Sequence, residues 1–365
     1  MRIGIVLHPY DQVHPGGLAR AIFGWTRALL SVDEENEYVI FLKQAPRRPP
    51  ELPGTRWKLV VLGPGYLWLN RLSRYPDLDA VVFHTPVVPL TYRPRRTVVV
   101  AYDFPYKHLP ACGLRERALH RAVGWYHRRS LRRANHIVTT SESTRRDVIE
   151  LFGISPERVS TIYHGFPRIC DVPERALALP ERFFLFTAVI KERKNVLNIL
   201  RAFTRFRAEH PGAPQHMVFC GRVGAGAYAR RVAAYIDEAA LQPFTHVLGH
   251  LDDGQLSYVY RRAEALVFPS LIEGFGLPVL EAMSCGVPVI TSNVFAPAEL
   301  GAGGAALLVD PYDVEDIARA MGTVVDEPEA RARLVAEGLI RSQEFTWEDA
   351  GRKLREVICA VGTAS

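Results

Sequence analysis

Short apolar runs alternate with helically spaced segments along the whole chain, and this alternation most constrains the fold. Residues 3–7 form an apolar run, and in residues 18–30 apolar side chains recur every three or four positions. The same alternation starts again at residue 183 and continues to residue 361. Strands that alternate with helices favour parallel sheets with helices on both faces. We therefore predict an α/β chain with two doubly wound, Rossmann-like sheets.

The chain has 365 residues, more than one hydrophobic core usually holds. Periodicity fades over residues 166–182, which contain three prolines. We therefore predict an N-terminal domain at 1–165, a linker at 166–182, a second domain at 183–345, and a helix at 346–365 that returns to the first domain. Ligands of open parallel sheets bind beyond the carboxyl ends of the strands, so two such domains facing each other would enclose a deep cleft.

Composition indicates an ordinary globular protein, with 48% hydrophobic and 23% charged residues. The cysteines are odd in number, widely scattered and without a C-x-x-C pair, so we expect neither a disulfide framework nor a zinc site, and we favour a reducing compartment. There is no run of about 18 apolar residues, and residues 1–7 are interpreted as a buried strand rather than a targeting segment. We expect a cytoplasmic protein that is either free or peripheral on the inner face of the membrane. The cysteines are Cys112, Cys170, Cys220, Cys285 and Cys359.

Charge is distributed unevenly, with 25 basic and 14 acidic residues in residues 1–170 against 20 and 25 in the remainder. Such asymmetry is typical of a surface that meets an anionic partner. No helix-turn-helix, RNP-like or zinc-finger pattern points to nucleic acid. An anionic membrane surface is the candidate partner, and a solvated basic helix face is the alternative. The basic and aromatic residues concerned are Trp125, Tyr126, Arg128, Arg129, Arg132 and Arg133.

The segment 270–283 carries the strongest chemical pattern, because it follows an apolar strand and opens a helix. Glu273 lies at the strand end and Glu281 in the early helix, and both could accept hydrogen bonds from sugar hydroxyls. Between them, a turn can present backbone N–H groups beside a helix N-terminus, which suits phosphate. The alternative is a structural turn in which Glu281 only complements the helix dipole. The turn consists of Gly274, Phe275, Gly276 and Leu277.

Three other loops follow predicted strands. Arg193 and Lys194 are adjacent cations that suit a diphosphate, and an exposed basic loop is the alternative. Gly16 and Gly17 would allow the backbone to approach a ligand closely, although a double glycine is often only a loop. Asp103 is either an active-site carboxylate or a structural residue at a strand end.

These segments together resemble retaining glycosyltransferases of family 4, which have the GT-B architecture of two Rossmann-like domains facing a cleft. Glu273 and Glu281 match the family's E-x7-E signature. The resemblance is most specific over residues 266–292 and extends to residues 134–165 and 305–311. The chain departs from the family pattern at Tyr102, where many members have histidine, and at Ala188 and Val189, where many have glycine and arginine.

The resemblance implies a nucleoside-diphosphate sugar as co-substrate, with no metal and no other cofactor. Lys194, with Arg193, would hold the diphosphate, and Glu273 would orient the donor sugar. Glu281 would bind the donor, at its ribose. The amides of Gly274, Phe275, Gly276 and Leu277 would complete the anion site, and the segment ending at Leu251 would touch the base. Gly16 and Gly17 would face the donor from the N-terminal domain, and Asp103 would be catalytic together with Glu273, Lys194 and Arg193.

The implied function is transfer of a hexose, with mannose favoured, to a saccharide or lipid-linked saccharide in polysaccharide or glycolipid assembly. Anomeric configuration would be retained and no metal would be required. Two alternatives remain open: a non-catalytic nucleotide-sugar-binding protein, and a GT-B epimerase or phosphorylase. A dinucleotide-dependent oxidoreductase fits poorly, because no G-x-G-x-x-G follows the first strand.

Overall fold

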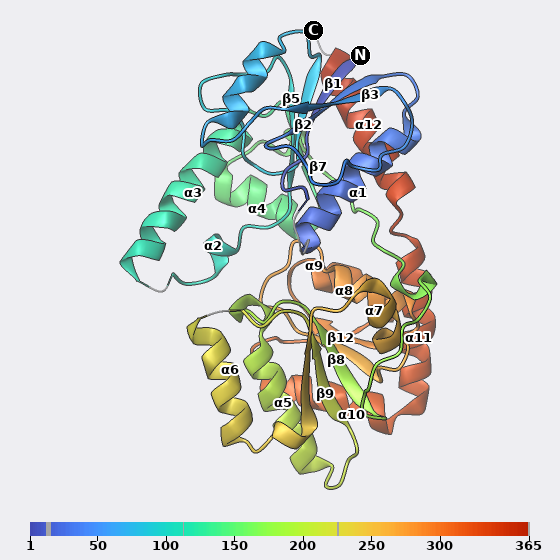
Figure 1. The fold of residues 1–365 in the computed structure, drawn as a ribbon. Coiled ribbons are helices and arrows are strands. Elements are labelled where there is room, and N and C mark those ends of the chain that lie inside the picture. Colours follow the sequence, from blue (N-terminus) through green and yellow to red (C-terminus); the bar gives the residue numbers. More distant parts are fainter. Residues whose placement is uncertain (12–15, 112, 225, 364–365) are drawn as a thin grey trace. The chain divides into compact units, whose positions relative to one another are not determined.

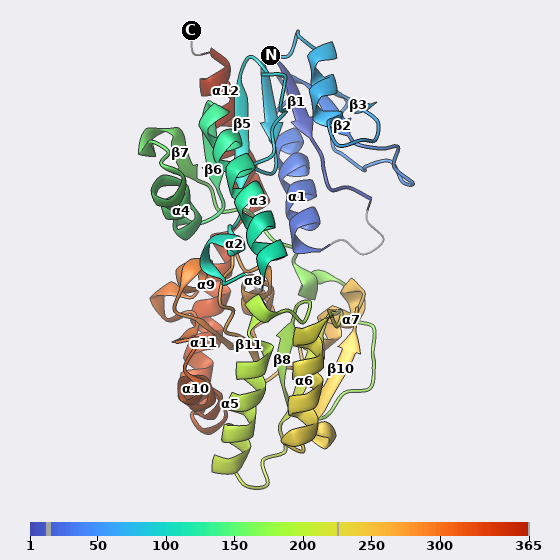
Figure 2. The ribbon, with the colours of Figure 1, turned by 90° about the vertical axis from the view of Figure 1, so that its left-hand side faces the viewer.

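The computed structural model describes residues 1–11, 16–111, 113–224 and 226–363. The chain divides into two compact units (Figures 1 and 2). The first unit comprises Met1–Phe166 together with Phe345–Ser365, and the second comprises Pro167–Glu344. The chain therefore leaves the first unit once and comes back to it. Residues 167–182, predicted as linker, belong to the second unit.

The first unit is built on a seven-stranded sheet in which all pairings are parallel, as predicted. Its strand order is β3-β2-β1-β4-β5-β6-β7, so the chain starts in the middle of the sheet and winds outwards to both edges. The strands are β1 (Arg2–Val6), β2 (Glu37–Leu42), β3 (Trp57–Val61), β4 (Ala80–Phe83), β5 (Thr97–Ala101), β6 (His136–Thr139) and β7 (Val159–Thr161).

Helices cover both faces of this sheet. Successive side chains of a strand point to opposite faces, so Ile5 packs against α1 (Gly17–Val32) and α12 (Trp347–Thr363). Its neighbour Val6 joins the other core layer, which α3 (Leu114–Arg133) and α4 (Glu142–Phe152) complete. A short helix, α2 (Pro105–His108), precedes α3. The C-terminal helix α12 is therefore an integral part of the first unit's core.

Two glycines allow α1 and α12 to pack closely. A methyl group on Gly351 would lie 2.6 Å from the carbonyl oxygen of Ala28, in the backbone of α1. A methyl group on Gly24 would likewise overlap the indole ring of Trp347, the first residue of α12. A larger side chain at either position would force the two helices apart.

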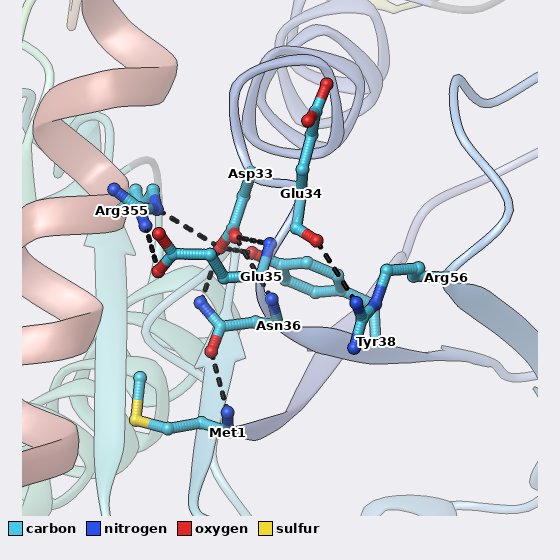
Figure 3. Close-up of polar contacts among 8 residues, drawn as sticks. All are labelled: Met1, Asp33, Glu34, Glu35, Asn36, Tyr38, Arg56 and Arg355. Atoms are coloured by element: carbon cyan, nitrogen blue, oxygen red, sulfur yellow. Dashed lines mark hydrogen bonds and ion pairs between the residues drawn. The ribbon is translucent and has the colours of Figure 1, made fainter.

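A polar network also ties α12 to the start of β2 (Figure 3). The buried carboxylate of Asp33 accepts hydrogen bonds from the Tyr38 hydroxyl at 2.5 Å and the Asn36 side chain at 2.6 Å. Arg355 of α12 lies 3.5 Å from the same carboxylate and 2.6 Å from Glu35. Burial by itself would raise the pKa of Asp33, but the hydrogen bonds from Asn36 and Tyr38 outweigh it and lower that pKa.

The second unit contains a six-stranded sheet, again with all pairings parallel, in the order β10-β9-β8-β11-β12-β13. The strands are β8 (Phe183–Thr187), β9 (His216–Cys220), β10 (Thr245–Gly249), β11 (Ala265–Phe268), β12 (Val289–Ser292) and β13 (Leu307–Val309). The helices are α5 (Val196–Glu209), α6 (Ala227–Glu238), α7 (Asp253–Tyr260), α8 (Leu277–Ser284), α9 (Phe295–Leu300), α10 (Val314–Asp326) and α11 (Pro328–Gln343). The apolar patterns did not predict β13 and α9, both of which are short.

A disulfide joins Cys170 to Cys285, so the scattered cysteines do form a cross-link, contrary to what their spacing led us to expect. Cys170 lies in a short 3-10 helix (Ile169–Asp171) that packs against α7 and α8, and Cys285 caps the C-terminus of α8. This packing brings the two α-carbons to 5.5 Å although 115 residues separate them in sequence. Cys220 and Cys359 are free thiols, and Cys112 lies outside the described residues. The cysteines therefore no longer support a reducing compartment.

Candidate functional site

Two loops of the second unit meet beyond the carboxyl ends of the adjacent strands β8 and β11. The first contains a 3-10 turn (Glu192–Lys194), and the carbonyl of Arg193 accepts a hydrogen bond from the Leu271 N–H at 2.9 Å. Asn195 holds a left-handed conformation, with a φ of 61°, and donates to the carbonyls of Pro269 at 2.9 Å and Pro311 at 2.6 Å. The two loops are thus fixed to each other by both main-chain and side-chain hydrogen bonds.

At this junction the structure brings together three predicted residues, Arg193, Lys194 and Glu273. The Lys194 ammonium makes a short ion pair with Oε1 of Glu273, and Nη1 of Arg193 lies 3.3 Å from the same oxygen. Burial alone would raise the pKa of Glu273, but the charges of Lys194 and then Arg193 lower it. Glu273 is therefore charged at neutral pH, and the three side chains together carry one net positive charge.

Lys194 is almost fully buried, with 9% of its surface exposed. Its ammonium lies 4.7 Å from the centre of the Phe268 ring, which adds a cation–π contact to the ion pair. The alternative of an exposed basic loop does not describe Lys194, because its charge is buried and paired with Glu273 and the Phe268 ring. A net positive, preformed cluster of this kind suits an anion such as a diphosphate.

The turn after Glu273 opens α8, as the sequence predicts. Gly276 precedes the helix with a φ of 108°, a conformation that side chains rarely adopt, so the turn requires glycine at this position. Pro278 lies in the first turn of the helix. Backbone N–H groups at a helix start have no intrahelical partners, and a glycine turn leaves room for an anion to approach them. Glu273 belongs to the charged cluster, so the turn that follows it in the chain adjoins that cluster. The turn consists of Gly274, Phe275, Gly276 and Leu277.

Glu281 is buried one helical turn into α8, with 6% of its surface exposed. The hydroxyl of Tyr260 donates a hydrogen bond of 2.9 Å to its Oε2. The same hydroxyl lies 2.9 Å from Oγ1 of Thr187, the last residue of β8. Sequence reasoning missed Tyr260 and Thr187, because each has the pattern of an ordinary core position.

The remaining predicted residues lie elsewhere. Leu251 is buried in the loop between β10 and α7, at the carboxyl end of its strand. Gly16 and Gly17 begin α1, and Asp103 follows β5. These last three residues belong to the first unit, whereas the Lys194 cluster belongs to the second. The part of the glycine loop at residues 12–15 lies outside the described residues.

Tyr102, the residue that replaces the family's histidine, has a buried hydroxyl with no hydrogen-bond partner among the described residues. Burial raises the pKa of Tyr102 far above its ordinary value, so the hydroxyl stays protonated and neutral.

Over the described ranges, no group of three or more His, Cys, Asp or Glu side chains is placed to hold a metal ion.

The surface of α3 differs in part from the predicted basic face. Tyr126 donates its hydroxyl to the Val88 carbonyl at 2.6 Å, and Arg129 and Arg133 donate to the Leu90 carbonyl, so these three side chains turn towards the unit's own backbone. Trp125 is 62% exposed. Arg128 is exposed as well, although it donates to the Leu151 carbonyl at 3.0 Å. One exposed face of the helix comprises Leu114, Arg117, Ala118, Arg121, Trp125, Arg128 and Arg132, and beside it Arg115, Leu119 and Ala122 are also exposed. Within the described residues, no helix is long and apolar enough to cross a membrane.

Two doubly wound parallel sheets, with a cation–carboxylate cluster beside a glycine turn, are the features expected of a GT-B glycosyltransferase. Family models agree: the model for glycosyl transferases group 1 matches residues 171–340, and the model for glycosyltransferase family 4 matches residues 15–168. The chain therefore belongs to the family 4 (group 1) glycosyltransferases, as the sequence resemblance predicts.

Relatives with assigned activities include O-antigen chain mannosyltransferase B of Escherichia coli, which is 28% identical over 75% of this chain and 72% of its own length. The serotype-specific mannosyltransferase WbdA of the same organism is 28% identical over 72% of this chain, but this match spans only 33% of WbdA. A glycogen synthase of Mycobacterium tuberculosis is also 28% identical, over 68% of this chain and 58% of its own length.

Solved structures share the fold at low sequence identity. The sucrose-phosphate synthase of Thermosynechococcus elongatus superposes with a TM-score of 0.79 over 100% of both chains, at 19% identity. HepE of Anabaena, in complex with UDP and glucose, gives a TM-score of 0.75 at 15% identity over 98% of this chain and 99% of its own.

Proposed function

We propose that this glycosyltransferase moves a hexose, with mannose favoured, from a nucleoside-diphosphate sugar to a saccharide or lipid-linked saccharide acceptor, with retention and without a metal. The observation that carries the proposal is the buried Lys194–Glu273 pair with Arg193 beside it. Mannose is favoured because relatives named as mannosyltransferases match this chain. A nucleotide-sugar donor is supported by a structural neighbour in complex with UDP-glucose.

The chemistry follows from where charge develops. The bond from the anomeric carbon to the phosphate oxygen breaks, and a bond from that carbon to the acceptor oxygen forms on the same face. The acceptor's proton passes to the departing diphosphate, whose negative charge grows in the transition state. Lys194 and Arg193 stabilise this charge without reorganising, because Glu273 already holds both cations in place. The N–H groups of the turn from Gly274 to Leu277 add further donors.

The other predicted residues have roles in binding and positioning. Glu273 orients the donor sugar, and Glu281 binds the ribose of the donor. Leu251 contacts the nucleotide base. In the first unit, Gly16 and Gly17 face the donor, and Asp103 takes part in catalysis.

A two-stage experiment tests the proposal. First, a thermal-shift screen against GDP, UDP, ADP and dTDP, each alone and as common sugar conjugates, identifies the donor, because a ligand of the folded state raises the Tm. Second, product analysis with mannose- and glucose-bearing donors and oligosaccharide acceptors identifies the reaction. Glu273→Gln and Lys194→Met are then compared with Lys191→Met, which removes an exposed lysine three residues away from Lys194.

We expect a selective nucleotide shift, a glycosylated acceptor, and a loss of kcat/KM of at least 100-fold in the two site variants, the order of magnitude measured when one transition-state donor is removed. Lys191→Met should retain wild-type turnover. Full turnover in both site variants would refute the assigned roles. Nucleotide binding without transfer or hydrolysis would support a non-catalytic nucleotide-sugar-binding protein. An epimerised or phosphorolysed product would support a GT-B epimerase or phosphorylase.

We also propose that α3 rests on an anionic membrane surface on the cytoplasmic side, where a lipid-linked acceptor would be held. Its exposed face combines Leu114 and Trp125, which are 77% and 62% exposed, with Arg117, Arg121, Arg128 and Arg132. A helix with arginines around apolar and aromatic side chains suits the boundary between lipid headgroups and acyl chains. Positive charge on this face complements anionic lipid and gives no advantage on a neutral bilayer.

Vesicle co-sedimentation tests this docking. Wild-type protein should bind phosphatidylglycerol-containing vesicles in low salt and be released by salt, and it should ignore pure phosphatidylcholine vesicles. The variant Arg117→Gln, Arg121→Gln, Arg128→Gln should lose most of this binding. A control pair in the second unit, Arg230→Gln with Arg333→Gln, should not change it. Equal binding by all variants would contradict the proposal.

A further inference from the structure

The hydroxyl of Tyr260 connects three elements of the second unit around Glu281. It lies 2.9 Å from Oε2 of Glu281, in α8, and 2.9 Å from Oγ1 of Thr187, at the end of β8. Tyr260 itself is the last residue of α7 and is fully buried. Neither Tyr260 nor Thr187 is among the residues assigned above to donor binding or catalysis.

The direction of both hydrogen bonds follows from the groups involved. A carboxylate can only accept, so the single proton of the Tyr260 hydroxyl is donated to Glu281. The Tyr260 oxygen can then accept from Thr187, whose hydroxyl supplies a proton of its own. Burial, reinforced by the charge of Glu281, raises the pKa of Tyr260 well above its ordinary value. The tyrosine therefore remains a donor at every pH at which the protein would work.

The consequence for Glu281 is orientation. Burying a carboxylate is costly without hydrogen bonds, and this carboxylate has 6% of its surface exposed. A bond to Oε2 from a rigid, fully buried ring restricts rotation of the carboxylate about its terminal torsion. Binding groups that are held in place in this way lose less freedom when a ligand arrives. Tyr260 can therefore affect a ligand that it does not touch.

We propose that Tyr260, supported by Thr187, is a positioning residue that orients Glu281 towards the ribose hydroxyls of the nucleotide donor. The proposal rests on the function proposed above, in which Glu281 binds the donor ribose. It adds that the contribution of Tyr260 to nucleotide affinity depends on one ribose hydroxyl, the one that donates a hydrogen bond to Glu281. A nucleotide without that hydroxyl should gain no affinity from Tyr260. It affects donor binding rather than the stabilisation of the departing diphosphate.

The test pairs the removal of one hydroxyl from the protein with the removal of one from the ligand. Dissociation constants are measured for whichever of UDP, GDP and ADP stabilises the wild type most, and for its 2′-deoxy and 3′-deoxy analogues. The variants are Tyr260→Phe, Thr187→Val and Glu281→Gln. Tyr258→Phe is the matched control, because it removes a hydroxyl from the same helix and its ring packs on Arg262, at 3.6 Å.

We expect Tyr260→Phe to weaken binding of the ribonucleotide by about five- to thirty-fold, which corresponds to a loss of about 1–2 kcal/mol of binding free energy. For one of the two deoxy analogues, wild type and Tyr260→Phe should bind within two-fold of each other. With a sugar donor, KM should rise while kcat stays within about two-fold. Thr187→Val should show a smaller change in the same direction, and Tyr258→Phe none. Thr187→Val also serves as the test if Tyr260→Phe fails to fold.

Two failures are distinguishable. If the wild type binds none of these nucleotides, the proposed function fails and this inference fails with it. If the wild type binds but Tyr260→Phe weakens ribonucleotide and both deoxy analogues equally, Tyr260 serves only the stability of the unit. In that case the inference is overturned while the proposed function stands.

Discussion

Arg355 in the C-terminal helix lies 3.5 Å from the buried carboxylate of Asp33, at the junction between α1 and β2 (Figure 3). These residues are 322 positions apart in the sequence, and both belong to the first unit. Asp33 also accepts hydrogen bonds from Asn36 and Tyr38. The carboxylate thus connects the two sequence segments from which the first unit is assembled.

Asp33→Asn should destabilise the first unit by about 1–3 kcal/mol at pH 7, because it replaces a charged acceptor of several hydrogen bonds. The pKa of Asp33 is lower in the folded protein than its ordinary value of 3.8. Its contribution to stability is therefore complete above pH 3.8 and disappears as the pH falls through the lowered value. Urea unfolding should show a constant difference between wild type and variant from pH 8 to pH 5. The control Glu34→Gln, at an exposed neighbour, should behave as wild type; a difference that shrinks between pH 7 and pH 5 would contradict the lowered pKa.

Lys194→Met should reverse the sign of the pH dependence that Glu273 gives to the stability of the second unit. In the wild type, the lowered pKa of Glu273 stabilises the fold above its ordinary value of 4.5, and this contribution is lost as the pH falls through the lowered folded value. Without its strongest cationic neighbour, the buried Glu273 should have a raised pKa, so its charge would cost stability at pH 7 and protonation would relieve that cost. The Tm deficit of Lys194→Met relative to wild type should therefore shrink from pH 7 to pH 5. Lys191→Met should show no deficit, and parallel Tm curves for Lys194→Met and wild type would show that the charge of Lys194 does not control Glu273.

Reduction of the Cys170–Cys285 disulfide should lower the stability of the second unit. The disulfide closes a loop of 115 residues, for which chain entropy gives about 4.7 kcal/mol as an upper estimate. Calorimetry should show a Tm lower by roughly 5–15 °C after treatment with dithiothreitol. The double variant Cys170→Ser, Cys285→Ser should have the lower Tm from the start and should not respond to dithiothreitol. An unchanged wild-type Tm after verified reduction would contradict this prediction.

Gly351→Ala should destabilise the first unit by about 1–3 kcal/mol, because the added methyl group meets the backbone of Ala28. Gly124→Ala is the matched control in α3, where the methyl group would make an ordinary contact, 3.4 Å from the Tyr106 ring. That variant should instead be neutral or slightly more stable, since alanine has the higher helix propensity. Urea midpoints for the first unit would separate the two cases. Equal effects of the two substitutions would mean that α1 and α12 are not closely packed.

The sequence predicted the sheets and the family because these depend on local patterns. Alternating apolar runs determine parallel strands, and the Glu273–Glu281 segment is contiguous. The pairing of Cys170 with Cys285 could not be predicted, because it results from packing between elements that are distant in the chain. Tyr260 was missed because a buried tyrosine that ends a helix does not reveal what its hydroxyl contacts. The inward orientation of Arg129 and Arg133 depends on which face of α3 meets the loop at Leu90, and charge clustering does not specify that face.

The position of α12 also has a consequence for the order of folding during synthesis. Residues 167–344, the whole second unit, emerge from the ribosome before the helix that covers one face of the first unit's sheet. Domains usually complete folding from the N-terminus onwards. Until α12 has been synthesised, the core layer that contains Trp25 lacks the helix that covers it. The core of the first unit can therefore be completed only after the whole of the second unit has been translated.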